Sequence, residues 1–140
     1  KQAVPSLLGR VRDRALLRAF HFYRENIRVE KAVSALESSN FDEFKKIINE
    51  SGRSSYMYNQ NVFTPKDPAE QKISLALCIS EEVLGVNGAY RVHGGGFAGT
   101  IQAFVPNELL QEYKTAMEDV FGKGSCHVLI IRPVGGTRVL

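Results

Sequence analysis

The chain has 140 residues, of which 44% are hydrophobic and 24% charged, the composition of an ordinary globular protein and enough chain for one domain. Its 18 basic and 15 acidic residues give a formal net charge of +3, without a long basic block or interleaved aromatic residues, so no nucleic-acid surface is expected. No apolar run approaches the length of a membrane span and no signal peptide is visible, so no membrane partner is expected either.

The N-terminal segment is predicted to be mostly helical. Lys1–Arg12 is a weakly patterned lead-in, and a long amphipathic helix follows from Asp13 to about Ser38. His21 is expected to be a surface or half-buried residue of this helix. The apolar stripe beside His21 recurs at helical spacing and consists of Leu16, Phe20, Tyr23, Ile27, Val29, Val33 and Leu36.

A second helix is predicted to open at Asn40, because Asn40 and Glu43 match a capping box. It is expected to end near Ser51-Gly52. The polar and aromatic stretch 54–64 is interpreted as a loop, with a short strand as the alternative. The inward face of the helix is expected to consist of Phe41, Phe44, Ile47 and Ile48.

A third helix is predicted to begin at Asp67-Pro68-Ala69-Glu70, with Asp67 as the N-cap and Pro68 as the first helical residue. Gly85 closes this helix. Its apolar stripe consists of Ile73, Ala76, Leu77, Ser80 and Val83.

Two strands and a fourth helix follow. Ala89–Val92 reads as a short strand, and Thr100–Val105 alternates with Ile101, Ala103 and Val105 on one face. After Pro106, Asn107 is expected to cap a helix that ends at Gly122. The inward residues of this helix are predicted to be Leu109, Tyr113, Ala116, Met117 and Val120.

The continuous apolar run Cys126–Ile131 predicts a last, central strand, terminated by Pro133. The order helix, strand, strand, helix, strand indicates an α+β fold: a ferredoxin-like antiparallel sheet with helices on one face, and two N-terminal helices packed outside. This unit lacks its first strand. Either Met57–Phe63 supplies that strand or it lies upstream of Lys1.

The two cysteines, Cys78 and Cys126, do not form a disulfide framework or a zinc site. Cys126 is followed by His127, but adjacent strand residues point to opposite faces and no further ligands converge in sequence. Both cysteines are therefore expected to be buried small hydrophobic residues. Free thiols suit a reducing compartment, and a cytoplasmic location is expected.

The most distinctive stretch is the glycine loop, Arg91-Val92-His93-Gly94-Gly95-Gly96-Phe97-Ala98-Gly99-Thr100. Its glycines match the dinucleotide fingerprint G-x-G-x-x-G, but that fingerprint needs a helix directly after the glycines. Here the next residues have a period of two and end at Pro106, so the match is fortuitous. A protein-kinase glycine loop is also excluded, because no lysine-bearing strand follows.

This strand–loop–strand segment resembles the third motif of the GHMP small-molecule kinases, most closely that of galactokinases, roughly Arg-Met-Thr-Gly-Gly-Gly-Phe-Gly-Gly-Cys-Thr-Val. The resemblance extends from about His21 to Gly136. It includes Arg24-Glu25-Asn26-x-Arg28-Val29, Asn49-Glu50-Ser51 and the tail Ile131-Arg132-Pro133-Val134-Gly135-Gly136. The chain departs from the family pattern at Gly52, where galactokinases carry histidine, and in the stretch 54–64.

The resemblance implies that residues 1–140 are the C-terminal domain of a longer two-domain sugar kinase, which transfers the ATP γ-phosphate to the C1 hydroxyl of galactose. It implies ATP and Mg²⁺ as cofactors, and a sugar, ATP and the missing N-terminal domain as partners. The main phosphate loop and the catalytic arginine and aspartate belong to that missing domain. No catalytic or metal-binding residue is therefore assigned here, and the isolated fragment is expected to be inactive.

The expected site residues form one wall of the nucleotide–sugar cleft: His93, Gly94, Gly95, Gly96, Phe97, Ala98 and Gly99. His93 replaces a common threonine and either reaches a phosphate or makes a structural hydrogen bond. Ala98 replaces a glycine, so a positive φ is not expected there. Asn26 and Arg28 face either solvent or the missing domain.

Other interpretations stay open at this point. A GHMP kinase for an amino sugar or a pentose would carry the same motifs. A non-catalytic relative could use sugar and ATP binding as a regulatory signal. A free-standing ferredoxin-like binding module, or a tight hairpin that packs only on its own domain, would need no kinase partner.

Overall fold

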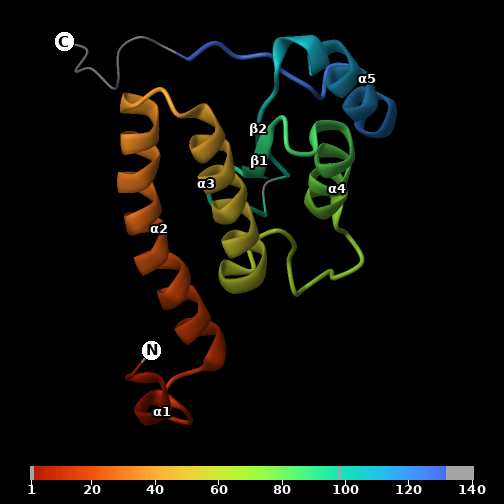
Figure 1. Cartoon of the computed structure of the whole chain (residues 1–140). Coiled ribbons are helices and arrows are strands. Elements are labelled where there is room, and N and C mark those ends of the chain that lie inside the picture. The colour runs from red at the N-terminus through yellow and green to blue at the C-terminus, as the bar shows by residue number, and fades with distance from the viewer. Residues whose placement is uncertain (1, 98, 132–140) are drawn as a thin grey trace, which may run out of the picture.

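The computed structural model describes residues 2–97 and 99–131, and it confirms the α+β class (Figure 1). The helices are α1 (Val4–Leu7), α2 (Asp13–Glu37), α3 (Phe41–Ser54), α4 (Lys72–Leu84) and α5 (Leu110–Phe121). A π-helix, η1 (Ser55–Asn59), continues α3, and a 3₁₀ turn, η2 (Asn107–Leu109), leads into α5. The two strands of the described part are β1 (Ala89–Val92) and β2 (Ile101–Phe104).

The sheet is an antiparallel hairpin in which Ala89 pairs with Phe104 and Val92 with Ile101. One face packs against α4 and α5, where Ile101, Ala103 and Val105 contact the buried core, as the alternation predicted. On the other face the ring of Phe104 meets Phe44 of α3 edge to face, 5.1 Å between centroids. In Figure 1 α2 lies on the far side of α3 from the sheet.

Three of the predicted helix ends are where the sequence places them, at Asn40, Gly85 and Gly122. The side chain of Asn40 accepts a hydrogen bond from the backbone N–H of Glu43 at 3.1 Å, which confirms the predicted cap. Helix α4 ends before Gly85 (φ +50°) and α5 before Gly122 (φ +95°), both as predicted. Asn107 makes no side-chain cap, and Val120 is exposed although it was expected to face inward.

Two predicted helix boundaries are wrong. Helix α3 does not end at Ser51-Gly52 but runs to Ser54 and continues into η1, so no strand forms over Met57–Phe63. Helix α4 begins at Lys72 rather than at Asp67. The N–H of Asp67 bonds to the carbonyl of Thr64 at 3.2 Å, and this turn takes the place of the expected N-cap.

The predicted strand over Cys126–Ile131 is also wrong, because these residues join neither strand of the described sheet. Leu129 and Ile130 are 86% and 92% exposed. No strand pairing links this segment to the described hairpin, and a strand needs such hydrogen bonds. Pro133 and the matched tail 132–136 lie outside the described residues. Cys126 is half-buried against the core, whereas Cys78 is exposed, contrary to the expectation that both are buried.

Helix α2 carries the predicted apolar stripe, but most of it faces solvent. Tyr23 and Val29 are 69% and 61% exposed, and Ile27 is exposed as well. The buried side of α2 carries Ala35 and polar residues instead, with His21 bonded to Ser54. No helix among the described residues is both long and apolar enough to cross a membrane.

Helix α3 approaches β1 closely at Gly52. A Cβ at this position would lie 2.9 Å from the carbonyl oxygen of Tyr90 and 3.3 Å from the Cβ of Arg91. A side chain as large as the histidine of galactokinases therefore cannot occupy this position without moving β1. Gly52 is buried here and does not end the helix.

We predict that Gly52→Ala destabilises the chain. Overpacking costs about 1–3 kcal/mol, and the better helix propensity of alanine offsets up to about 1 kcal/mol. We therefore expect a net loss of about 1 kcal/mol in the free energy of unfolding, measured by urea denaturation. Glu50→Ala on the exposed side of α3 is the control and should change the stability by less than about 0.5 kcal/mol. A Gly52→Ala chain as stable as the parent would contradict the close approach.

Candidate functional site

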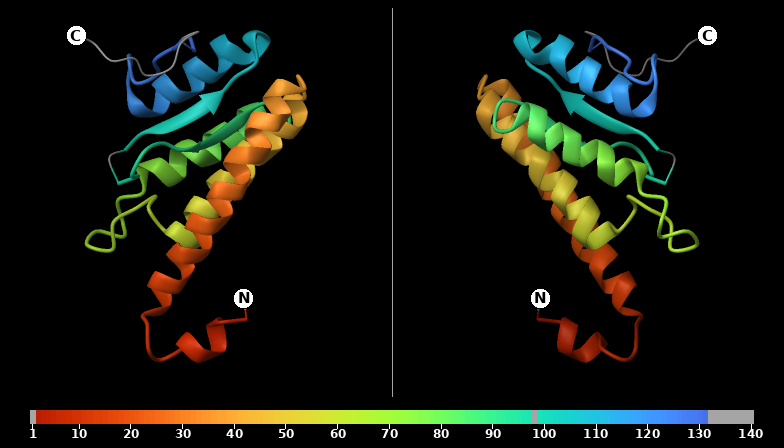
Figure 2. Two further views of the ribbon diagram at one scale, coloured as in Figure 1. Left: turned by 90° about the vertical axis from the view of Figure 1, so that its left-hand side faces the viewer. Right: turned by 90° about the vertical axis from the view of Figure 1, so that its right-hand side faces the viewer.

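The glycine loop connects β1 to β2 and is closed by a hydrogen bond from the N–H of His93 to the carbonyl of Thr100 at 3.1 Å. Gly94, Gly96 and Gly99 adopt φ angles of +63°, +72° and +80°. Residues with a Cβ resist this left-handed region, so the glycines are needed for the path of the backbone. The tip of the hairpin lies beside the segment that leads into α4 (Figure 2).

One side of the loop is fixed to Asn61. The N–H of Phe97 donates to the backbone carbonyl of Asn61 at 2.9 Å, and the side-chain amide of Asn61 donates to the carbonyl of Gly95 at 3.2 Å. A Cβ on Gly96 would lie 2.0 Å from the carbonyl oxygen of Asn61. The loop is therefore held in place by a residue that sequence reasoning missed, because the stretch 54–64 has no periodic pattern.

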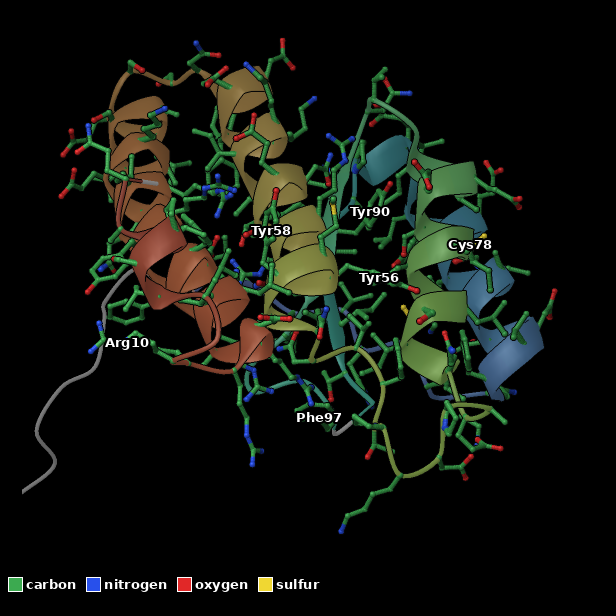
Figure 3. All side chains as sticks on the ribbon, turned by 90° about the horizontal axis from the view of Figure 1, so that it is seen from below. Arg10, Tyr56, Tyr58, Cys78, Tyr90 and Phe97 are labelled. Carbon is green, nitrogen blue, oxygen red and sulfur yellow. The ribbon has the colours of Figure 1, made fainter. Side chains whose placement is uncertain are left out.

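The other side of the loop is open. A Cβ added at Gly94, Gly95 or Gly99 would meet no heavy atom of residues 2–97 and 99–131 within 4 Å. His93 is exposed, and Phe97 is 50% exposed at the tip of the hairpin (Figure 3). The hairpin is thus not buried within its own domain. Ala98, another predicted site residue, lies outside the described residues.

Phe97 has a φ angle of +56° although it carries a bulky side chain. This conformation is uncommon outside glycine and persists only where the surroundings hold it. Here the hydrogen bond from Phe97 to Asn61 and the tight contact at Gly96 hold it. Strain of this kind is concentrated at functional sites, which supports a functional role for the loop.

The loop is positioned by a charged cluster around Glu25 that joins α2, α3 and β1. The Glu25 carboxylate pairs with Arg28, accepts a hydrogen bond from the hydroxyl of Ser51 at 2.6 Å, and lies 3.8 Å from the guanidinium of Arg91. Three sequence motifs therefore meet at one carboxylate, directly before the loop. Arg28 points into this chain, whereas Asn26 is exposed.

Two further polar contacts fix α3 against its neighbours. The side chain of Asn49 accepts from the N–H of Tyr90 at 2.9 Å and donates to the carbonyl of Gly88 at 3.3 Å, so it satisfies the edge of β1 that faces away from β2. The Nδ1 atom of His21 lies 3.0 Å from the hydroxyl of Ser54. Burial lowers the pKa of His21, and the nearby Glu25 opposes this shift.

Helix α2 also supports the segment that carries Asn61. Arg14 donates to the carbonyl of Gln60 at 3.1 Å, and Arg18 donates to the carbonyl of Asn59 at 3.3 Å. The guanidinium of Arg24 lies over the ring of Tyr58, 5.0 Å from its centroid. These contacts hold the end of η1 in place beneath the loop.

Apart from the imidazole of His93, the loop can bind an anion only through its backbone. Exposed glycine amides can approach a phosphate closely, and this is consistent with ATP as the expected cofactor. The sequence 93–99 contains no lysine or arginine that could neutralise the charge of a phosphate. Within the described ranges no three His, Cys, Asp or Glu side chains come together as a metal site.

A hollow of about 340 Å³ lies between α3 and α4, apart from the glycine loop, and was not predicted from the sequence. Tyr56, Cys78 and Tyr90 are among its lining residues, and Figure 3 shows Tyr56 and Tyr90 between the two helices. Burial raises the pKa of Tyr90, and the carboxylate of Glu81 adds to this shift. No residue of the glycine loop lines this hollow.

An α+β domain that presents an open, backbone-only glycine loop between two strands is what the resemblance to small-molecule kinases implies. Comparison with known proteins confirms the resemblance to galactokinases. The chain is 36% identical over 106 residues to a galacturonokinase of Arabidopsis thaliana, a match that covers 76% of this chain and 23% of that protein.

Two bacterial galactokinases are also similar. The galactokinase of Mannheimia succiniciproducens is 30% identical over 109 residues, which cover 78% of this chain and 26% of that protein. The galactokinase of Glaesserella parasuis is 28% identical over 116 residues, which cover 83% of this chain and 28% of that protein. The chain thus spans about a quarter of the length of these relatives. No family model and no solved structure matches it.

We predict that Phe97→Gly gives a more stable chain than Phe97→Ala. Both variants remove the ring, but only glycine relieves the cost of the left-handed backbone, about 1–2 kcal/mol. The difference in the free energy of unfolding should be about 1 kcal/mol by urea denaturation. The same pair of substitutions at Phe22, an exposed residue of α2, should give the opposite order, because alanine is the better helix former. Equal stability of the two Phe97 variants would show that the loop is not strained.

Proposed function

We propose that residues 1–140 are the C-terminal domain of a GHMP-type sugar kinase, and that its glycine loop forms one wall of the cleft for ATP and sugar. The observation that carries this proposal is the asymmetry of the loop, which is fixed to Asn61 on one side and open on the other. The similarity to galactokinases and a galacturonokinase supports the reaction class. The hairpin and its helices would be part of a ferredoxin-like sheet, whose other strands are not among the described residues.

The partner of this domain would be the N-terminal domain of the same enzyme. The relatives are about four times longer than the matched segment, which supports such a domain. The outward face of α2 also supports it, because exposed apolar residues such as Tyr23, Ile27 and Val33 favour burial against another surface. We place the docking surface on this side of α2 and on the open side of the loop.

Phosphoryl transfer requires positioned phosphates, neutralised charge and a group that activates the acceptor hydroxyl. The loop would contribute to the first requirement by packing against the phosphate-binding part of the N-terminal domain. ATP supplies the transferred γ-phosphate, and Mg²⁺ would be held outside this chain. Gly94, Gly95 and Gly99 leave room for close backbone contact, and the exposed His93 would donate a hydrogen bond to a phosphate. A cytoplasmic enzyme is consistent with the two free thiols.

The acceptor we propose is the C1 hydroxyl of galactose, with galacturonic acid as the second candidate. The galacturonokinase of Arabidopsis thaliana is 36% identical over the matched segment, against 30% for the galactokinase of Mannheimia succiniciproducens, which keeps the second sugar in consideration. The two sugars differ by a carboxylate at C6. A basic residue facing that position would select galacturonic acid, and it would belong to the N-terminal domain.

We predict that the product of the complete reading frame makes sugar 1-phosphate from galactose or galacturonic acid with ATP and Mg²⁺, whereas the 140-residue chain makes none. The measurement is ³¹P NMR of the products, with glucose as the control sugar. Phosphorylation by the 140-residue chain would contradict the division of roles between the domains. Failure of the complete protein with both sugars would contradict the proposed activity.

Gly95→Ala tests the role of the loop within the same experiment. Gly95 does not have a positive φ, and a Cβ there would meet no atom of the described residues within 4 Å. The variant should therefore keep the stability of the 140-residue chain within about 0.5 kcal/mol. In the complete enzyme we expect kcat/KM for ATP to fall by about tenfold to a hundredfold, because the added methyl group displaces the docked loop. Unchanged activity would show that the loop does not form a wall of the cleft.

A further inference from the structure

We propose that Asn61 is a positioning residue for the glycine loop, which acts on the reaction through the loop and not by touching the substrate. This inference rests on the proposed function, which gives the loop its place in the cleft. Asn61 was not among the residues predicted from the sequence. It makes a backbone hydrogen bond, a side-chain hydrogen bond and a tight steric contact with the loop.

Three contacts link Asn61 to the loop, one to each of three consecutive residues. Its side-chain amide donates to the carbonyl of Gly95 at 3.2 Å, and its backbone carbonyl accepts from the N–H of Phe97 at 2.9 Å. Between them Gly96 lies so close that a Cβ would be 2.0 Å from the carbonyl oxygen and 2.7 Å from the amide nitrogen. The backbone path of residues 95–97 is therefore set by their contacts with Asn61.

Asn61 itself has little freedom to move. It is 3% exposed, and its neighbour Val62 is buried against Ile73 and Val92. On the other side the carbonyls of Asn59 and Gln60 are held by arginines of α2. Any displacement of the glycine loop must therefore break its bonds to Asn61 or distort this packed segment.

The side-chain amide of Asn61 is oriented by its hydrogen bond to the loop. The Oδ1 atom is buried and has no hydrogen-bond partner among the described residues. An unsatisfied buried acceptor is unfavourable. The orientation that places Nδ2 against the carbonyl of Gly95 leaves Oδ1 without a partner, and reversing the amide would place two oxygens 3.2 Å apart. The contact to Gly95 is thus the one interaction that defines the side-chain orientation.

Asn61→Asp is the sharpest test, because it keeps the shape and replaces the donor with an acceptor. At neutral pH the carboxylate would face the carbonyl of Gly95 and repel it. We expect the amide of Phe97 to exchange with solvent about tenfold faster or more in the 140-residue chain, as for a lost hydrogen bond to a buried group. Burial raises the pKa of the introduced carboxyl above its usual value of about 3.9.

Acidification should therefore restore a donor and return the loop to its parent state. The readout is the ¹H–¹⁵N shift of the Phe97 and Gly96 amides as the pH is lowered, which should move toward the parent value in Asn61→Asp only. Asn107→Asp makes the same chemical change at an exposed residue before α5 and is the control. Asn61→Ser, which is smaller, tests the amide contact if Asn61→Asp fails to fold, and it should also accelerate exchange at Phe97.

In the complete enzyme we expect Asn61→Asp to lower kcat by about tenfold or more and to leave the KM for the sugar within about twofold. Parent-like exchange at Phe97 in both Asn61 variants would overturn the proposal whatever the activity. A displaced loop with parent-like kcat would overturn the link to catalysis. A complete protein that phosphorylates no sugar would refute the proposed function, while the exchange data would still decide the role of Asn61 in the loop.

Discussion

The arrangement of this chain depends on the contacts that the carboxylate of Glu25 makes. It lies where α2, α3 and β1 meet, and it contacts a residue from each of them: Arg28, Ser51 and Arg91. A partly buried carboxylate needs such partners, since its desolvation would otherwise be costly. Because Arg91 lies in β1, this cluster fixes the strand from which the glycine loop emerges. The motifs that resemble galactokinases thus act here as scaffolding.

The same cluster explains why α2 is oriented with its apolar side outward. His21, Glu25 and Arg28 recur at helical spacing on the side that faces α3. The apolar residues between them, such as Tyr23 and Val29, must then point away from the chain. Helix α2 therefore has one side packed in this chain and an opposite side that is apolar and exposed. The glycine loop has the same character, with one side fixed to Asn61 and the other bare.

Local rules in the sequence predicted the parts of the fold that depend on local chemistry. The Asn40 cap, the glycines after α4 and α5, and the alternation in β2 were all readable because neighbouring residues determine them. The role of Gly52 was not readable, because it depends on the approach of a strand far along the chain. Asn61 was missed for the same reason.

Hydrophobicity alone misled the prediction at the C-terminus. The run 126–131 has the composition of a buried strand, but strand formation depends on a neighbour that the described hairpin does not provide. The open side of the glycine loop was anticipated from its lack of side chains, whereas its fixed side required knowledge of the segment that packs beneath it. The run of glycines singled out the candidate site, and tertiary contacts explain how the loop is held.

The most direct measurement compares hydrogen exchange at the amides of Gly94, Gly95 and Gly99 in the 140-residue chain and in the product of the complete reading frame. We expect these amides to exchange rapidly in the 140-residue chain and at least about tenfold more slowly in the complete protein, because a docked surface excludes water from them. Addition of ATP should slow them further. Equal exchange in the two proteins, with and without ATP, would contradict a loop that docks on a second domain.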